Sequence, residues 1–208
     1  MLSNFGFDLW SGRYDTTVRS CDENNEYPFA GYSNLMNAIY GTIMNKPSSD
    51  ILDIGFGTAA LTSKLYAGGN NITGLDFSEQ MLKTAQSKMP NAKLLLWDFN
   101  NGIPSEIKNE TFDFIVSTYA LHHLSDGAKI RFISKLLDLL KPGGVILIGD
   151  VCFKTRDDLL ACKNSCGEYW DDDEIYFVFS EIKDKLTNRC SLTLHEFSFC
   201  AGVIEICK

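Results

Sequence analysis

The chain of 208 residues lacks the features that would direct it to a membrane, a secretory route or a nucleic acid. No stretch reaches the roughly 20 apolar residues of a membrane-spanning helix, and Met1 to Trp10 have neither a basic start nor an apolar run. No block of Lys and Arg offsets the formal charge of −8, so a polyanion would be repelled. We therefore expect a cytoplasmic, single-domain protein that binds neither nucleic acid nor membrane.

The sequence also lacks a disulfide framework. Its seven cysteines are odd in number and irregularly spaced, which favours reduced thiols. Cys162 and Cys166 lie one helical turn apart and could share a metal ion, but no nearby pair of Cys or His completes a tetrahedral site. We predict two ordinary thiols on a helix and no metal site.

The most informative feature that is present is a glycine loop. An apolar run from Ile51 to Ile54 turns through Gly55 and Gly57 into a predicted helix. Glycine has no Cβ, so the chain can bend sharply and let a ligand touch the main chain, with the helix N-terminus directed at that ligand. The pattern indicates a site for a nucleoside cofactor.

Short apolar runs and helical periodicity alternate after this loop, which is typical of successive βαβ units. We predict an α/β fold, a doubly wound Rossmann-like sheet of seven strands in a three-layer αβα arrangement. The sheet is mostly parallel and closes with an antiparallel hairpin, because the last two runs are joined too tightly for a parallel crossover. The predicted strands after the loop are Ile72 to Asp76, Lys93 to Trp97, Phe112 to Thr118, Val145 to Asp150, Cys190 to Phe197 and Phe199 to Cys207.

Side chains that follow the strands should converge on one crevice. Asp76 could accept both hydroxyls of a ribose, or be a solvated acid at a strand end. Asp98 could accept a hydrogen bond from an adenine amino group beside the ring of Trp97 or Phe99, or simply cap a turn. Asp53 lies inside the first strand, where a buried carboxylate needs hydrogen-bond donors.

An acid two residues before the first glycine resembles motif I of the class I S-adenosylmethionine-dependent methyltransferases, whereas a nicotinamide-binding loop usually has an apolar residue there. The segments 75–78, 117–124 and 140–144 resemble later motifs of that family in order and spacing. Two departures are Ala59 in place of the third glycine and the bulky Phe56 between the first two. The resemblance implies S-adenosylmethionine as cofactor, bound by Tyr14, Asp53, Gly55, Gly57, Asp76, Phe77, Asp98, Phe99 and Ser117.

The start of the chain, Trp10 to Asp15, resembles an uncharacterised group of bacterial small-molecule methyltransferases, in which a lid tyrosine, here Tyr14, closes over the cofactor. The resemblance divides the single domain into a lid over 1–28, a cofactor-binding half over 29–150, and a substrate cap with the hairpin over 151–208. Residues 1–28 and the stretch from Val151 to Asp173 should roof the acceptor pocket. The resemblance also implies methyl transfer to a small-molecule acceptor. The identity of the acceptor, its target atom and the oligomeric state of the protein stay open.

An acceptor that carries a proton needs a base, and the candidates are His122, His123, Tyr119 and Asp150. Adjacent histidines should diverge, so we expect at most one of them to face the crevice, and both could instead be packing residues. The acidic run 171–174 either attracts a cationic acceptor or caps a helix beginning near Glu174. Two alternatives remain: a module that binds S-adenosylmethionine without transfer, and a nicotinamide-dependent oxidoreductase.

Overall fold

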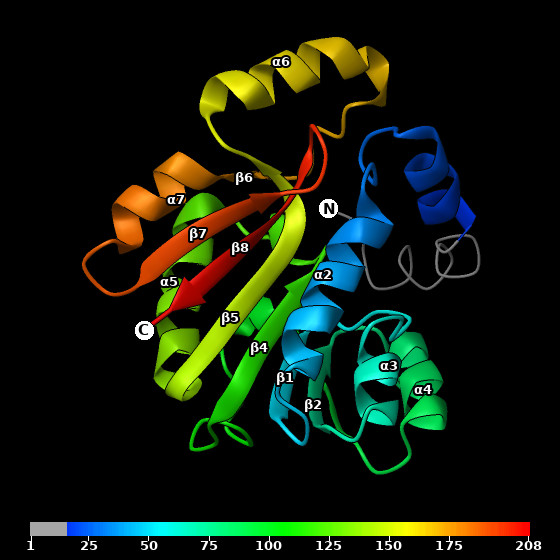
Figure 1. The fold of residues 1–208 in the computed structure, drawn as a ribbon, viewed down its shortest axis with the longest axis vertical. Coiled ribbons are helices and arrows are strands. Elements are labelled where there is room, and N and C mark those ends of the chain that lie inside the picture. The colour runs from blue at the N-terminus through cyan, green and yellow to red at the C-terminus, as the bar shows by residue number, and fades with distance from the viewer. Residues whose placement is uncertain (1–15) are drawn as a thin grey trace.

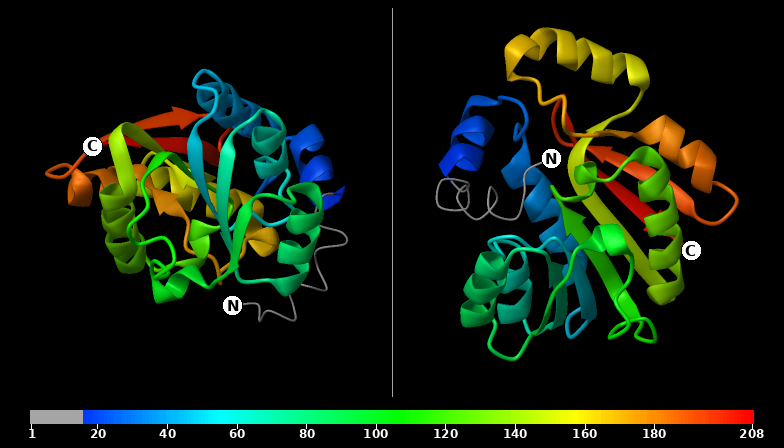
Figure 2. Two further views of the ribbon diagram at one scale, coloured as in Figure 1. Left: turned by 90° about the horizontal axis from the view of Figure 1, so that it is seen from below. Right: turned by 180° about the vertical axis from the view of Figure 1, so that it is seen from behind.

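The computed structural model describes residues 16–208, and it confirms a sheet covered by helices on both faces (Figures 1 and 2). The strand order is β3-β2-β1-β4-β5-β8-β7, with a short strand β6 paired to β5 outside this path. The strands are β1 (Asp50–Ile54), β2 (Asn71–Asp76), β3 (Lys93–Leu96), β4 (Phe112–Thr118), β5 (Leu140–Phe153), β6 (Phe177–Val178), β7 (Ser191–Glu196) and β8 (Ala201–Cys207).

The sheet is parallel from β3 to β5 and antiparallel at β8 and β7, as predicted. The order changes direction at β1, which lies between β2 and β4. This is the point at which ligands bind in open α/β sheets, because the crossovers leave on opposite sides there. The glycine loop follows β1 directly and so lies at this point.

Helices form two layers that pack on two separate cores. On one face Leu35, Ile39 and Ile43 of α2 are buried together with residues of α3 and α4, and on the other face α5 and α7 pack. Helix α6 lies beyond the end of β5, where it packs on a smaller cluster (Figure 1). The bounds are α2 (Tyr32–Met44), α3 (Thr62–Ala67), α4 (Glu79–Lys88), α5 (Asp126–Leu136), α6 (Arg156–Cys166) and α7 (Phe179–Leu186); residues 16–24 are also helical.

Local sequence signals account for the boundaries of several elements. The Ser78 hydroxyl accepts a hydrogen bond from the Met81 amide at 3.2 Å, which makes Ser78 the N-cap of α4. Thr155 and Asp158 form a capping box at the start of α6. None of the helices within 16–208 is long and apolar enough to cross a membrane.

Two predictions about the C-terminal half are wrong. The helix expected near Glu174 begins only at Phe179, because Phe177 and Val178 pair with β5 as strand β6. The acidic run 171–174 therefore lies in a loop and does not charge a helix N-terminus. The stretch 151–173, expected to roof the acceptor pocket, contains the whole of α6, and its residues Val151, Tyr169 and Asp171 line a cavity at the carboxyl edge of the sheet.

Candidate functional site

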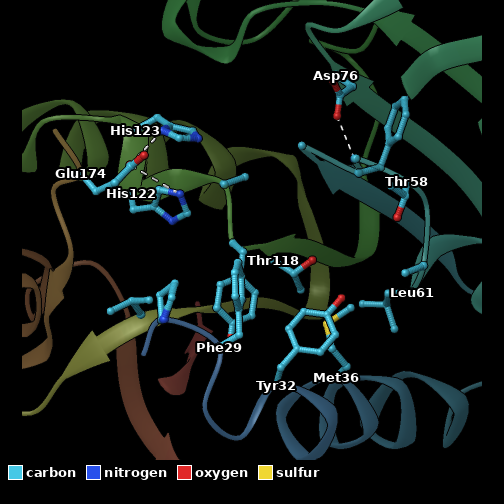
Figure 3. Close-up of a pocket in the computed structure, with 18 of the residues that line it drawn as sticks. Phe29, Tyr32, Met36, Thr58, Leu61, Asp76, Thr118, His122, His123 and Glu174 are labelled. Atoms are coloured by element: carbon cyan, nitrogen blue, oxygen red, sulfur yellow. Dashed lines mark hydrogen bonds and ion pairs between the residues drawn. The ribbon is translucent and has the colours of Figure 1, made fainter. Parts of the chain in front are cut away.

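A cavity of about 340 Å³ lies at the carboxyl ends of β1, β2 and β4, between the glycine loop and the loop before β6. Its volume is within the range of small-ligand sites. Figure 3 shows Asp76 on one side of this space, His122, His123 and Glu174 on another, and the rings of Phe29 and Tyr32 along a third. The cavity thus joins a predicted cofactor end to a predicted acceptor end.

The structure brings most of the predicted site residues to this cavity. Tyr14 lies outside the described residues. Asp53, Asp98 and Ser117 are not among the described residues that line the cavity. The predicted residues that do line it are Gly55, Gly57, Asp76, Phe77, Phe99, Tyr119, His122 and His123.

The glycine loop is held in conformations that other residues rarely adopt. Gly55 has a φ of +72°, and a Cβ added there would lie 2.5 Å from the Cβ of Ala120. Gly57 has a φ of +52° and open space where a Cβ would stand. Ala59, which replaces the third glycine of the motif, is buried and also has a positive φ, of 59°. A Cβ at position 55 would clash with Ala120, and one at position 57 would occupy the space of the ligand.

Asp76 anchors the same loop. Its Oδ2 accepts a hydrogen bond from the Gly57 amide at 2.8 Å, and its Oδ1 accepts one from the Ser78 amide at 2.9 Å. The residue is 5% exposed and lines the cavity. A carboxylate held by two backbone amides is fixed in direction, which suits recognition of a ligand hydroxyl pair.

Asp53 lies directly behind the loop and is buried. Its Oδ2 accepts a hydrogen bond from the Thr62 hydroxyl at 2.5 Å, and Thr62 lines the cavity. Within the described part of the chain Oδ1 of Asp53 has no hydrogen-bond partner. Burial raises the pKa of the Asp53 carboxyl to about 7, the Thr62 bond opposes that rise, and the charge of Asp76 adds to it. Such an orphaned buried oxygen is expected where a ligand or water completes a site.

Two other predicted cofactor residues, Asp98 and Ser117, have local structural contacts, as does Phe56 between the two glycines. Asp98 is exposed, and its Oδ1 accepts hydrogen bonds from the Asn100 backbone and side-chain amides at 2.8 Å, so it caps the short helix after β3. Ser117 donates its hydroxyl hydrogen to the Ile54 carbonyl at 2.9 Å and ties β4 to β1. The ring of Phe56 packs against Gly74 in the core while it forms part of the cavity wall.

The histidine pair contradicts the expectation that at most one ring faces the crevice. His122 and His123 both line the cavity, with ring centroids 4.4 Å apart. The two residues lie in a 3-10 helix over Leu121–His123, and Glu174 brings the rings together. The Oε2 of Glu174 lies 2.9 Å from Nδ1 of His123 and 3.5 Å from Nε2 of His122. Sequence reasoning missed this role of Glu174, since the contact spans two distant segments.

Asp150 orients one of these rings. Its Oδ1 lies 2.6 Å from Nδ1 of His122 and accepts the Val151 amide at 2.8 Å. Burial lowers the pKa of His122, but the neighbouring carboxylates of Asp150 and Glu174 outweigh burial, so the net shift is upward. For Glu174 burial raises the pKa, and the two histidines reverse this to a net lowering. Both shifts favour the charged forms of His122 and Glu174.

Aromatic rings that the sequence did not single out form much of the remaining wall. The ring centroids of Phe29 and Tyr32 each lie 5.3 Å from that of Tyr119, which has a φ of 49°. Tyr27 and Tyr176 line the cavity as well, and their hydroxyls are hydrogen bonded to each other. These rings make an apolar wall beside the space between the glycine loop and the histidines.

The sequence and the structure both match known proteins. A family described as "Methyltransferase domain" matches residues 51–144. An uncharacterised methyltransferase of Anoxybacillus flavithermus is 35% identical over 73% of this chain and 68% of its own length, and one of Geobacillus sp. (strain WCH70) is 37% identical over 72% and 68%.

Solved methyltransferase structures share the fold of this chain. The DhpI complex with S-adenosylhomocysteine has a TM-score of 0.70 at 18% identity, over 97% of this chain and 92% of that one. The magnesium protoporphyrin IX methyltransferase of Synechocystis PCC 6803, also with S-adenosylhomocysteine, has a TM-score of 0.66 at 18% identity, over 86% and 84%. The chain belongs to the class I S-adenosylmethionine-dependent methyltransferases.

Proposed function

We propose that this methyltransferase transfers the methyl group to a small-molecule acceptor that binds between the glycine loop and the cluster of His122, His123 and Glu174. The observation that carries the proposal is that a single cavity of about 340 Å³ reaches both. The described residues that line it include no Lys or Arg, so a nucleic acid would meet no counter-charge there. A small acceptor fits the volume and the aromatic walls.

The residues at the cofactor end fit S-adenosylmethionine. Asp76 presents a fixed carboxylate for the ribose hydroxyls, and Gly57 leaves open space beside its main chain. Phe77 and Phe99 offer ring faces for the adenine. The orphaned Oδ1 of Asp53 supports a role in organising the methionine end. We do not include Asp98 among the proposed cofactor contacts, since its carboxylate caps a turn.

When bound, S-adenosylmethionine supplies a sulfonium methyl group that is already a good electrophile, so alignment and exclusion of water are the protein's main tasks. Phe29, Tyr32 and Tyr119 wall the space in which an acceptor would sit. His122, His123 and Glu174 offer polar atoms at the acceptor end, and Asp150 fixes the direction of the His122 ring.

The buried carboxyl of Asp53 should make stability depend on pH. Its pKa is raised to about 7 in the folded state, so between about pH 4 and pH 7 the folded protein keeps a proton that the unfolded chain has lost. The stabilisation that comes from this bound proton is therefore complete below about pH 4 and is lost as the pH rises from there through 7. Asp53→Asn cannot titrate, and its stability relative to wild type should increase by about 2–4 kcal/mol between pH 4 and pH 8.

Urea unfolding of both proteins across this range measures the difference. Asp138→Asn changes an exposed aspartate and should follow the wild-type curve. Parallel curves for Asp53→Asn and wild type would show that Asp53 is ionised throughout. We expect Asp53→Asn to bind S-adenosylmethionine more weakly than wild type. The variant would then gain stability and lose function.

An assay of S-adenosylhomocysteine formed from S-adenosylmethionine in the presence of small amines, alcohols, phenols, carboxylic acids or thiols tests the proposed function. We expect turnover with one chemical class, and a loss of at least tenfold in kcat/KM for Glu174→Gln because it lies at the acceptor end. Turnover only with proteins or nucleic acids would overturn the small-molecule assignment. Binding of S-adenosylmethionine without turnover on any class of acceptor would favour the alternative of a binding module.

A further inference from the structure

Three ligand atoms of the histidine cluster converge on one point beside the cavity. One ring nitrogen of each of His122 and His123 and an oxygen of Glu174 all lie within 4.8 Å of one another, and the nitrogens that pair with Glu174 are Nε2 of His122 and Nδ1 of His123. Their side chains face each other across the cavity wall in Figure 3. Two imidazole nitrogens and one carboxylate oxygen are a donor set that binds divalent transition metals.

The distances within the cluster suit a shared ion. Metal bonds of roughly 2.0–2.2 Å to nitrogen and oxygen place neighbouring ligand atoms roughly 3–3.5 Å apart. The Glu174 oxygen lies 2.9 Å from the His123 nitrogen and 3.5 Å from the His122 nitrogen. The two histidine nitrogens lie within 4.8 Å of each other, so a side-chain adjustment that brings them to roughly 3.5 Å would place all three atoms at bonding distance from one ion.

A second layer of contacts orients these ligands. Asp150, 1% exposed, holds Nδ1 of His122 at 2.6 Å, which leaves Nε2 of that ring to face Glu174. A carboxylate on the far nitrogen of a histidine is the usual support of a metal-bound imidazole. No described residue forms a hydrogen bond with Oδ2 of Asp150.

The backbone brings Glu174 to the histidines. The amide of Ile175 donates a hydrogen bond to the His122 carbonyl at 2.9 Å, which joins the loop before β6 to the 3-10 helix. The buried ammonium of Lys129 donates to the Ile175 carbonyl and pairs with Asp126 at 3.2 Å. Lys129 thus fixes the loop and forms its ion pair with Asp126. The donor set is held in place by contacts outside itself.

We propose that His122, His123 and Glu174 bind one divalent transition-metal ion at the acceptor end of the cavity. Three protein ligands leave coordination positions open, and all three residues line the cavity. An acceptor that offers an oxygen atom would occupy an open position and be held next to the methyl donor. The sequence alone predicts no metal site. Glu174 is far from the histidines along the chain, and among Cys and His residues only Cys162 and Cys166 are spaced by one helical turn.

Cobalt(II) is the probe for this site, since its visible absorption reports coordination in the absence of any methyl transfer. The full chain should bind one equivalent of Co²⁺, and Zn²⁺ should compete for it. Mg²⁺, which prefers oxygen ligands, should not. His123→Ala and Glu174→Gln should each weaken Co²⁺ binding by at least about tenfold. Far-ultraviolet circular dichroism and melting curves establish that the variants are folded.

The chain offers two matched controls. His195 and Glu205 form an exposed pair at 3.1 Å on the hairpin, so His195→Ala removes a His–Glu contact elsewhere and should leave Co²⁺ binding unchanged. The sulfurs of Cys162 and Cys166 lie 3.8 Å apart, and the double variant Cys162→Ser/Cys166→Ser tests whether thiols bind the ion. We expect full binding in that variant as well.

Absence of stoichiometric Co²⁺ and Zn²⁺ binding by the wild-type protein would overturn the proposal. So would loss of binding in the cysteine variant with normal binding in His123→Ala and Glu174→Gln. These outcomes are independent of the acceptor panel, because the titration contains no S-adenosylmethionine and measures no turnover.

Discussion

Replacing Asp76 by alanine is expected to weaken S-adenosylmethionine binding by about 100-fold, because the change removes two roles at once. The carboxylate would no longer be available to the ribose hydroxyls, and hydrogen bonds to a charged group each contribute roughly 1.5–3 kcal/mol. The Gly57 and Ser78 amides would also lose their acceptor, so the loop that the cofactor must touch would be less ordered. Isothermal titration with S-adenosylmethionine and S-adenosylhomocysteine measures the loss.

Two further variants separate these roles. Asp76→Asn keeps one oxygen as an acceptor for a backbone amide, and we expect an intermediate affinity. Asp138→Ala removes an exposed aspartate that lies 3.7 Å from Arg189, away from the cavity, and should bind the cofactor as wild type does. Affinity of Asp76→Ala within about threefold of wild type would disprove the ribose assignment.

The second large effect is expected at Gly55. In Gly55→Ala the new Cβ would stand 2.5 Å from the Cβ of Ala120, at a φ of +72°. Left-handed backbone costs a non-glycine residue roughly 1–2 kcal/mol, and overpacking adds roughly 1–3 kcal/mol. We therefore expect the free energy of unfolding to fall by about 3 kcal/mol, measured by urea denaturation.

Gly57→Ala is the matched comparison. Its φ is +52°, yet no atom lies within 4 Å of the added Cβ, so stability should fall by only about 1 kcal/mol. The methyl group would instead stand in the space beside the loop, and cofactor affinity should fall by at least about tenfold. Equal destabilisation by the two variants would contradict the packing difference between these glycines.

Much of the fold follows from local patterns. The strand Phe112–Thr118 was predicted with its observed bounds, since a continuous apolar run between turn signals suits a buried parallel strand. The reversed hairpin β7–β8 followed from the shortness of its connection. Predictions were wrong where tertiary pairing decided the outcome. Phe177 and Val178 pair with β5, which delayed the last helix to Phe179.

The cofactor end of the site was easier to predict than the acceptor end. Gly55, Gly57 and Asp76 lie near one another along a single βαβ unit, so residue spacing constrains them. Glu174 comes from a loop far along the chain, and only the Ile175–His122 backbone contact brings it to the histidines. Asp98 had two open interpretations, and its hydrogen bonds to Asn100 favour the turn.

The amino-acid sequence by itself determined the methyltransferase family, the glycine loop and the alternation of strands and helices, because these depend on residues that are neighbours along the chain. Only the tertiary structure decided that both His122 and His123 face the cavity, that Glu174 and Asp150 hold them, and that aromatic rings close the wall. Contacts between distant segments depend on how the sheet's loops pack at its carboxyl edge, and residue spacing carries no record of that packing.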